Sequence, residues 1–103
     1  MKRARILLAD DHLLTLEGIR TVLEPHHEIV GTVTDGRALL EAALCLKPEL
    51  IVLDITMPLL NGIDAAVQIK KNLPEAKLLF VTMHVNPAYL EAALGAGGIL
   101  DTS

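Results

Sequence analysis

The chain has 103 residues, of which 51% are hydrophobic and 21% charged, and its formal net charge is -4. This length corresponds to one domain over residues 1–103, and the apolar content excludes a disordered chain. The acidic charge and an aromatic content of 2% argue against direct nucleic-acid binding, which needs basic patches and stacking surfaces. No apolar run approaches the roughly 18 residues of a membrane span, no secretory leader opens the chain, and one cysteine excludes an internal disulfide. We therefore expect a globular, cytoplasmic domain without a membrane partner.

Four short apolar runs have the length and the continuous apolarity of strands that are buried on both faces of a parallel sheet. They cover residues 6–9, 29–33, 50–53 and 78–81. A stripe of apolar residues at helical spacing follows each run. The four stripes are Leu16, Ile19 and Leu23; Leu39, Ala43 and Leu46; Ile63, Ala66, Val67 and Leu73; and Leu90, Ala93 and Leu94. This alternation of strands and helices predicts a doubly wound α/β sheet.

Proline and capping residues indicate where the helices begin and end. Pro25, Pro48 and Pro74 each stand between a helical stretch and the next apolar run, where a helix has to stop. Short polar residues at the start of a helical stretch are predicted N-caps. These are Asp35, Asn61 and Asn86, the last of which is followed by Pro87.

The last nine residues depart from this pattern. After the glycine-rich stretch 95–98, only Ile99 and Leu100 have strand character before the chain ends. We therefore expect a fifth strand that is cut short, and no fifth helix. Such a sheet leaves the edge of the strand at 78–81 open, and an exposed apolar edge recruits another chain. The hypothesis is a homodimer that pairs these edges or exchanges the segment after about Asn86; the alternative is a monomer with an irregular tail.

Polar residues stand where three of the four strands end. Asp10 and Asp11 follow the first run, Asp54 follows the third, and Thr82 ends the fourth. These side chains should converge, because ligands of open α/β sheets bind at the carboxyl ends of the strands. Clustered carboxylates resist ionising together, and oxygen ligands suit Mg²⁺. A carboxylate beside such an ion can attack phosphorus and form an aspartyl phosphate. Any one of these aspartates alone would more often be a cap or turn residue; the joint pattern favours a phosphoacceptor site.

Three motifs resemble the receiver domain of bacterial two-component response regulators, in particular that of LuxR-type transcription factors. They are residues 8–12 (LADDH), residues 54–62 (DITMPLLNG, with the pattern D-x-x-M-P-x-x-x-G) and residues 81–84 (VTMH). The resemblance covers residues 4 to about 97 and implies a flavodoxin-like fold.

This resemblance implies that a histidine kinase phosphorylates Asp54 and that transcription is controlled through a DNA-binding domain that the chain lacks. The implied activity is limited to self-catalysed phosphotransfer and autodephosphorylation. The implied roles are phosphoacceptor for Asp54, Mg²⁺ ligands for Asp10, Asp11, Asp54 and the backbone carbonyl of Thr56, switch hydroxyl for Thr82, and loop shaping for Met57, Pro58 and Gly62.

Receiver domains carry a lysine at the end of the fifth strand that binds the phosphoryl oxygens, and this sequence departs from the family at that position. No lysine follows Lys77, and the lysine position falls one residue past Ser103 or near Asp101, depending on the alignment. This departure favours an alternative function, a receiver-like interaction module that works without phosphorylation. A second alternative is a Mg²⁺-dependent phosphatase with Asp54 as nucleophile. It is disfavoured because the position two residues later, where a general acid would be needed, is Thr56.

The histidines are predicted to be surface residues, and the cysteine is predicted to be a packing residue. His12, His26, His27 and His84 lack the spacing of metal ligands, and residues 26–27 are expected to form a solvated loop. Cys45 lies among alanines of the second helical stretch and is predicted to be a small core or near-core residue.

Overall fold

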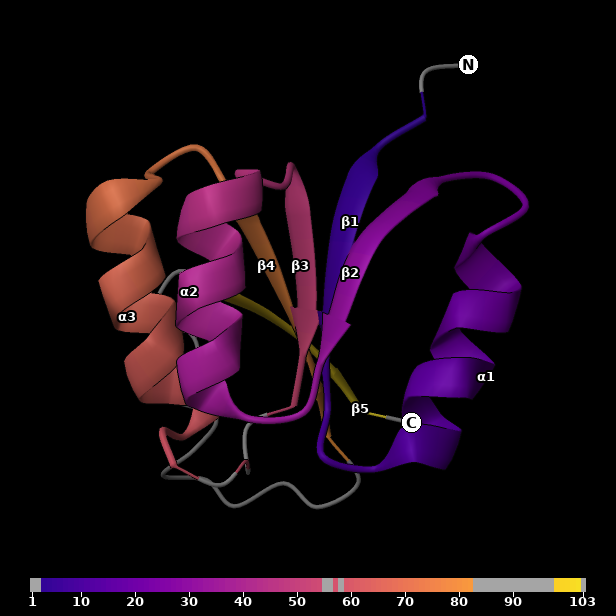
Figure 1. The fold of residues 1–103 in the computed structure, drawn as a ribbon, viewed down its shortest axis with the longest axis horizontal. Helices are drawn as coiled ribbons and strands as arrows, with labels where there is room; N and C mark the ends of the chain where they lie inside the picture. Colours follow the sequence, from indigo (N-terminus) through magenta and orange to yellow (C-terminus); the bar gives the residue numbers. More distant parts are fainter. Residues whose placement is uncertain (1–2, 55–56, 58, 83–97, 103) are drawn as a thin grey trace.

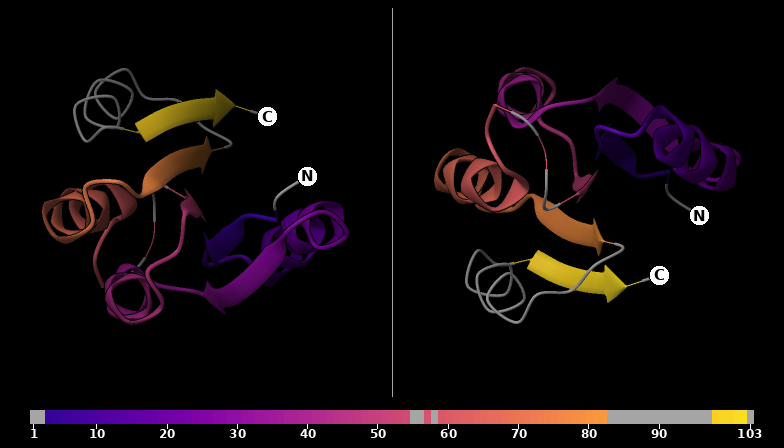
Figure 2. Two further views of the ribbon diagram at one scale, coloured as in Figure 1. Left: turned by 90° about the horizontal axis from the view of Figure 1, so that it is seen from above. Right: turned by 90° about the horizontal axis from the view of Figure 1, so that it is seen from below.

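The computed structural model describes residues 3–54, 57, 59–82 and 98–102 (Figure 1). The elements follow in the order β1 (Arg5–Ala9), α1 (Leu13–Leu23), β2 (Glu28–Val33), α2 (Gly36–Leu46), β3 (Leu50–Leu53), α3 (Gly62–Asn72), β4 (Lys77–Thr82) and β5 (Gly98–Thr102). All strand pairs are parallel, and the sheet order is β2-β1-β3-β4-β5. Helices α2 and α3 pack on one face of the sheet and α1 on the other (Figure 2). The predicted doubly wound α/β fold is confirmed.

The central strands are buried on both faces. In β1, Leu7 packs into the larger core beneath α2 and α3, whereas its neighbours Ile6 and Leu8 pack into the smaller core beneath α1. In β4, Phe80 belongs to the larger core and Leu79 packs against the smaller one. Successive side chains of a strand point to opposite faces, so both sets have to be apolar. This explains why the strand segments are continuous apolar runs rather than alternating ones.

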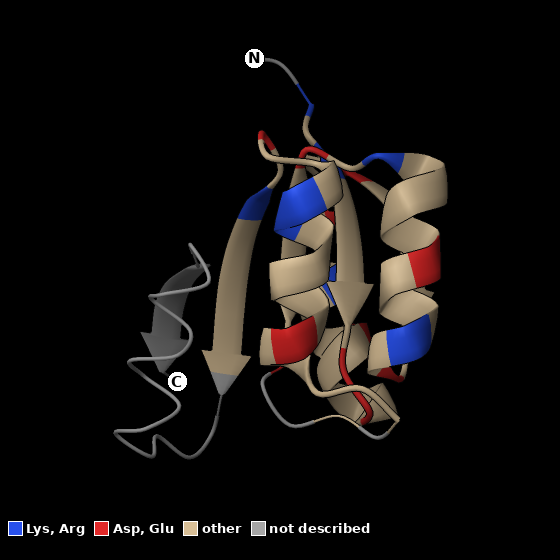
Figure 3. Ribbon diagram, turned by 90° about the vertical axis from the view of Figure 1, so that its left-hand side faces the viewer, with Lys and Arg blue, Asp and Glu red and all other residues tan. Residues whose placement is uncertain are grey.

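Capping residues fix the amino ends of α2 and α3. The Asp35 side chain accepts a hydrogen bond from the Ala38 amide at 2.7 Å, and the Asn61 side chain accepts one from the Asp64 amide at 2.9 Å. Helix α3 also carries Asp64 in its first turn and two lysines in its last turn, charges that complement the helix dipole (Figure 3). The predicted N-caps at Asp35 and Asn61 are confirmed, whereas the one at Asn86 lies outside the described residues.

Two residues predicted to pack inward face solvent instead. Val67 is 40% exposed, because it lies about 100° further around α3 than the buried Ala66. Cys45 is exposed on α2, two positions beyond the buried Ala43 and therefore on the opposite side of the helix. Among the described residues, no helix has both the length and the apolarity that a membrane span requires.

The fifth strand is longer than the sequence suggests. It pairs with β4 along its whole length and ends with Thr102 opposite Thr82. Only Ile99 and Leu100 were expected to have strand character, but pairing depends on backbone hydrogen bonds, which the flanking polar residues and glycine also provide. The prediction that β4 leaves an open edge is therefore wrong, because β4 is an inner strand. The predicted fourth helix, around residues 90–94, lies outside the described residues.

Candidate functional site

The site lies at the carboxyl ends of β1 and β3, which are neighbours in the sheet. Ala9 and Leu53 are the last residues that pair between these strands. One residue further along, the Asp10 amide donates to the Val33 carbonyl at 3.1 Å, and the Asp54 amide donates to the Ala9 carbonyl at 3.0 Å. The hydrogen bonds of the sheet thus extend to both aspartates. The sheet therefore holds the backbone at both residues.

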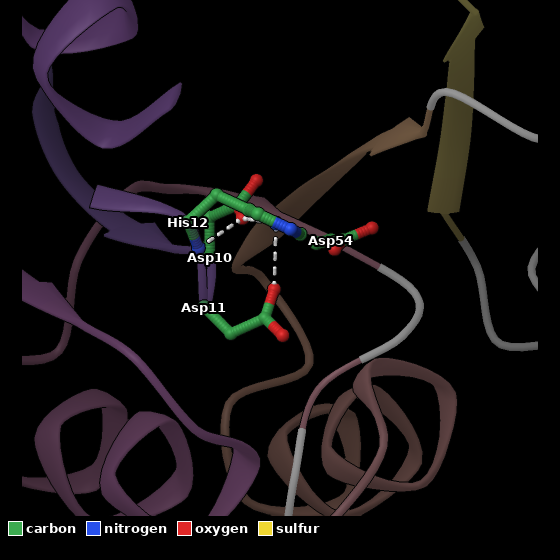
Figure 4. A group of neighbouring side chains, drawn as sticks. All are labelled: Asp10, Asp11, His12 and Asp54. Carbon is green, nitrogen blue, oxygen red and sulfur yellow. Dashed lines mark hydrogen bonds and ion pairs between the residues drawn. The ribbon is translucent and has the colours of Figure 1, made fainter. Parts of the chain in front are cut away.

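Four side chains meet at this edge: Asp10, Asp11, His12 and Asp54 (Figure 4). One potential ligand atom from each lies within 4.8 Å of the others. The side chain of Asp10 is 8% exposed, that of Asp11 34% and that of His12 73%, and Asp54 is half-buried. The cluster therefore has a buried carboxylate at its base and an open rim. The structure brings Asp10, Asp11 and Asp54 together, as the strand ends predict.

His12 bridges the two adjacent carboxylates. Its backbone amide donates to Oδ1 of Asp10 at 2.8 Å, and its ring Nδ1 lies 3.2 Å from that oxygen and 2.9 Å from Oδ1 of Asp11. The hydrogen bond with Asp10 raises the pKa of His12 above its usual value of 6.5, and the negative charges of Asp11, Asp10 and Asp54 raise it further. The sequence pattern does not predict His12 as a site residue, because the histidines lack the spacing of metal ligands along the chain. The available signal was its position directly after two aspartates, where a strand turns into a helix.

The other described histidines lie away from this cluster. His26 is exposed, as expected for a solvated loop. His27 is half-buried, and its Nδ1 accepts a hydrogen bond from the Ala4 amide at 3.2 Å. His27 therefore ties the start of β1 to the turn before β2, so the prediction of a solvated loop is wrong for this residue. His84 lies outside the described residues.

The loop after Asp54 is anchored on two sides. Met57 is 6% exposed and belongs to the larger core, so it fixes the loop from within. The Leu60 carbonyl oxygen lies so close to Gly36 that a Cβ at this position would overlap it. Only glycine therefore fits at the first position of α2. Between these anchors, Leu59 adopts a left-handed backbone conformation with φ 70°.

The remaining predicted site residues lie around this loop. Gly62 is buried and is the first residue of α3. Thr82 is the last residue of β4, the strand next to β3, so its backbone lies toward the same edge of the sheet as Asp54. Thr56 and Pro58 lie outside the described residues. The functional roles of these residues stay predictions.

The donor set fits a divalent cation. Three carboxylates offer the oxygen ligands that Mg²⁺ prefers, and the separations allow them to share one ion. The buried carboxylate of Asp10 accepts a hydrogen bond from the His12 amide and lies 3.2 Å from Nδ1 of the His12 ring, and these contacts offset the cost of its burial. Asp54 is less deeply buried than Asp10. Its carboxylate is the better placed of the two to meet a reactant that arrives from solvent.

A doubly wound parallel sheet with carboxylates clustered at the ends of β1 and β3 is the architecture of a signal receiver domain. A family model described as the response regulator receiver domain matches residues 6–100. The chain therefore belongs to the response regulator receiver domain family, and the resemblance seen in the sequence motifs is confirmed.

Known proteins similar to this chain agree with the family. The transcriptional regulatory protein MctR of Rhizobium johnstonii is 35% identical over 102 residues, which cover 95% of this chain and 48% of MctR. A LuxR-family two-component response regulator from an Aurantimonas species has a solved structure with a TM-score of 0.89 and 32% identity, covering 98% of this chain and 74% of that one. The receiver domain of NarL from Mycobacterium tuberculosis gives a TM-score of 0.87 and 29% identity, with 97% and 84% covered. The chain spans about half the length of the curated relatives it matches.

Proposed function

We propose that this domain is a phosphoacceptor, in which Asp54 receives a phosphoryl group from a histidine kinase with Mg²⁺ as cofactor. The proposal rests on the cluster at the carboxyl edge, where ligand atoms of Asp10, Asp11 and Asp54 lie within 4.8 Å of one another. These carboxylates would hold the ion together with the backbone carbonyl of Thr56. When bound, Mg²⁺ supplies positive charge that offsets the charge of the phosphoryl and carboxylate oxygens.

The proposed transfer uses Asp54 as the nucleophile. A carboxylate oxygen of Asp54 attacks the phosphorus of a phosphohistidine, and the new P–O bond forms as the P–N bond breaks. The electron pair of the P–N bond leaves on the imidazole nitrogen, which takes up a proton. Asp10 is unsuited to this role, because it is buried and hydrogen-bonded to His12. Attack of water on the acyl phosphate would return the domain to its unphosphorylated form. The proposed catalysis is limited to the domain's own phosphorylation and autodephosphorylation.

Phosphorylation would act on the domain through charge and packing. The phosphoryl group adds about −1.5 to −2 charge and strong acceptor oxygens. We propose that the hydroxyl of Thr82 donates to one of these oxygens, and that Met57, Pro58 and Gly62 shape the loop between Asp54 and α3. Because Met57 is part of the larger core, a movement of this loop has to repack core side chains. This coupling would connect the site to the rest of the domain.

The test is phosphorylation by a small donor such as acetyl phosphate. In the presence of Mg²⁺, we expect the wild type to gain the mass of one phosphoryl group and to lose it in hydroxylamine, as an acyl phosphate does. Asp54→Asn should gain none, whereas Asp64→Asn, an exposed aspartate on α3, should react like the wild type. EDTA should abolish the reaction. Normal phosphorylation of Asp54→Asn would show that the acceptor is misassigned.

A second candidate function is a receiver-like interaction module that works without phosphorylation. The observation that favours it is the sequence of β5, in which none of the five residues is the lysine expected to bind the phosphoryl oxygens. The acetyl phosphate experiment separates the two functions, since the module would not react. Continuous release of phosphate from the donor would instead indicate the phosphatase considered above.

The wider role is proposed from the family. The domain would receive its signal in the bacterial cytoplasm and control transcription through a DNA-binding domain outside this chain, in line with the name of MctR. A homodimer is a further proposal, in which β5 pairs with β4 of a second copy rather than with its own. Sedimentation at micromolar concentration tests it, and a purely monomeric species that unfolds cooperatively would exclude the exchange.

A further inference from the structure

The imidazole of His12 lies among the carboxylates of the cluster. Its Nδ1 lies 2.9 Å from Oδ1 of Asp11 and 3.2 Å from Oδ1 of Asp10, and ligand atoms of all four residues are mutually within 4.8 Å (Figure 4). Adjacent ligands of an octahedral ion with bonds of about 2.1 Å are separated by about 3.0 Å. Nδ1 therefore already lies, from each of the two oxygens, at about the separation of neighbouring ligands around one ion.

Within the described part of the chain, the hydrogen bonds and ion pairs of the His12 ring are confined to its contacts with Asp10 and Asp11. His12 is the N-cap residue of α1, yet its side chain makes no capping hydrogen bond to the helix. The hydrogen bond that shapes the turn after β1 comes from its backbone amide, which donates to Asp10. The ring itself is 73% exposed, so it fills no core volume. A substitution of the ring therefore removes its contacts with the two carboxylates and leaves the packing of the core unchanged.

We propose that His12 supplies a nitrogen ligand and thereby sets the metal preference of this site toward first-row transition-metal dications. The inference rests on the proposed metal site of the receiver. Carboxylate and carbonyl oxygens alone suit Mg²⁺, whereas imidazole suits ions such as Zn²⁺, Ni²⁺ and Co²⁺. Binding through Nδ1 displaces the proton that this nitrogen shares with the carboxylates, which moves to Nε2 or to solvent, and the bound ring is neutral with its proton on Nε2. Oxygen ligands from three aspartates remain available to Mg²⁺, so the nitrogen adds affinity for one class of ion without removing the other.

The experiment compares the binding of Co²⁺ alone and of Mg²⁺ alone by isothermal titration calorimetry. His12→Gln should weaken Co²⁺ binding by at least about tenfold, the lower range for substitutions that support a metal site, and leave Mg²⁺ binding nearly unchanged. His26→Gln, which removes an exposed histidine outside the cluster, should change neither affinity. Asp11→Asn should weaken both ions. The visible absorption of bound Co²⁺ should also change in His12→Gln, because a nitrogen ligand is lost.

The outcomes distinguish this inference from the proposed function. Unchanged Co²⁺ affinity in His12→Gln, or an equal loss of affinity for both ions, would show that His12 is not a ligand. If Mg²⁺ still supports phosphorylation of Asp54 in that case, only the assignment of His12 is wrong. If the wild type neither binds Mg²⁺ nor is phosphorylated with it, the proposed function fails as well.

Discussion

Replacing Asp54 with asparagine removes one negative charge from a crowded cluster while keeping the shape of the side chain. Ligand atoms of Asp10, Asp11 and Asp54 lie within 4.8 Å of one another, and Asp10 is buried. The repulsion between Asp54 and the other two carboxylates opposes folding, because the unfolded chain holds Asp54 far from Asp10 and Asp11. We therefore expect Asp54→Asn to raise the free energy of unfolding in metal-free buffer, although it removes the proposed phosphoacceptor.

The size of the effect follows from these separations. Two unit charges 4.8 Å apart repel by about 0.9 kcal/mol at the dielectric constant of water, and more in a partly buried site. Asp54 faces two such charges, Asp10 and Asp11. Its attraction to protonated His12 and the screening by salt both offset part of this repulsion. The expected net gain is a few tenths to about 1 kcal/mol.

Urea denaturation with EDTA and with excess Mg²⁺ provides the test. Bound Mg²⁺ should stabilise the wild type by about 2.7 kcal/mol at a hundredfold excess over its Kd, and should stabilise Asp54→Asn less, so the order of stability reverses. Asp64→Asn makes the same charge change on the exposed surface of α3 and should show no such reversal. A wild type that is more stable than Asp54→Asn in EDTA would refute the reasoning from repulsion. If Mg²⁺ left the difference in free energy of unfolding between the wild type and Asp54→Asn unchanged, the proposed ion site would be refuted.

Two further predictions concern the support of the site and its pH dependence. Gly36→Ala should destabilise the domain by about 1–3 kcal/mol in urea denaturation and slow its phosphorylation, because the added Cβ overlaps the Leu60 carbonyl oxygen. Gly18→Ala, with nothing within 4 Å of the added Cβ, should be neutral or slightly stabilising, and equal stability of the two variants would contradict the overlap. In metal-free buffer, NMR should give His12 a pKa above 6.5 that falls in Asp10→Asn. Protonation of His12 then stabilises the folded state. This stabilisation is complete below about pH 6.5 and is lost as the pH rises through the pKa of His12 in the folded state. A measured pKa at or below 6.5 would contradict the prediction.

The strands and the acidic cluster could be predicted because they depend on local and periodic features. Strands buried on both faces have to be apolar at every position, and this makes them visible as continuous runs. Asp10 and Asp54 each directly follow the end of such a run, and the parallel pairing of β1 with β3 then brings them together. Helix starts were visible for a similar reason, since a cap is a contact between residues a few positions apart.

The missed features depend on how backbone turns orient single side chains. His12 joins the cluster because the chain turns between β1 and α1, and the spacing of ligands along the sequence does not report that turn. Val67 is predicted to pack inward from an apolar stripe at helical spacing and Cys45 from its alanine neighbours, but the angle of each residue around its helix leaves it exposed. The polar end of β5 pairs through backbone hydrogen bonds, and these leave no pattern of side chains in the sequence.

In this site, backbone hydrogen bonds hold the strand ends in place, and the carboxylate side chains provide the chemistry. The amides of Asp10 and Asp54 are held by the carbonyls of Val33 and Ala9, and these bonds do not involve the carboxylates. A change of side chain at either position can therefore alter charge, metal preference or reactivity while the strand ends stay in place. The cost of the site lies instead in the repulsion between its carboxylates, which a bound cation removes. We therefore expect Asp54→Asn to be more stable than the wild type and yet unable to accept phosphate. Such a trade-off between stability and activity is common at functional sites.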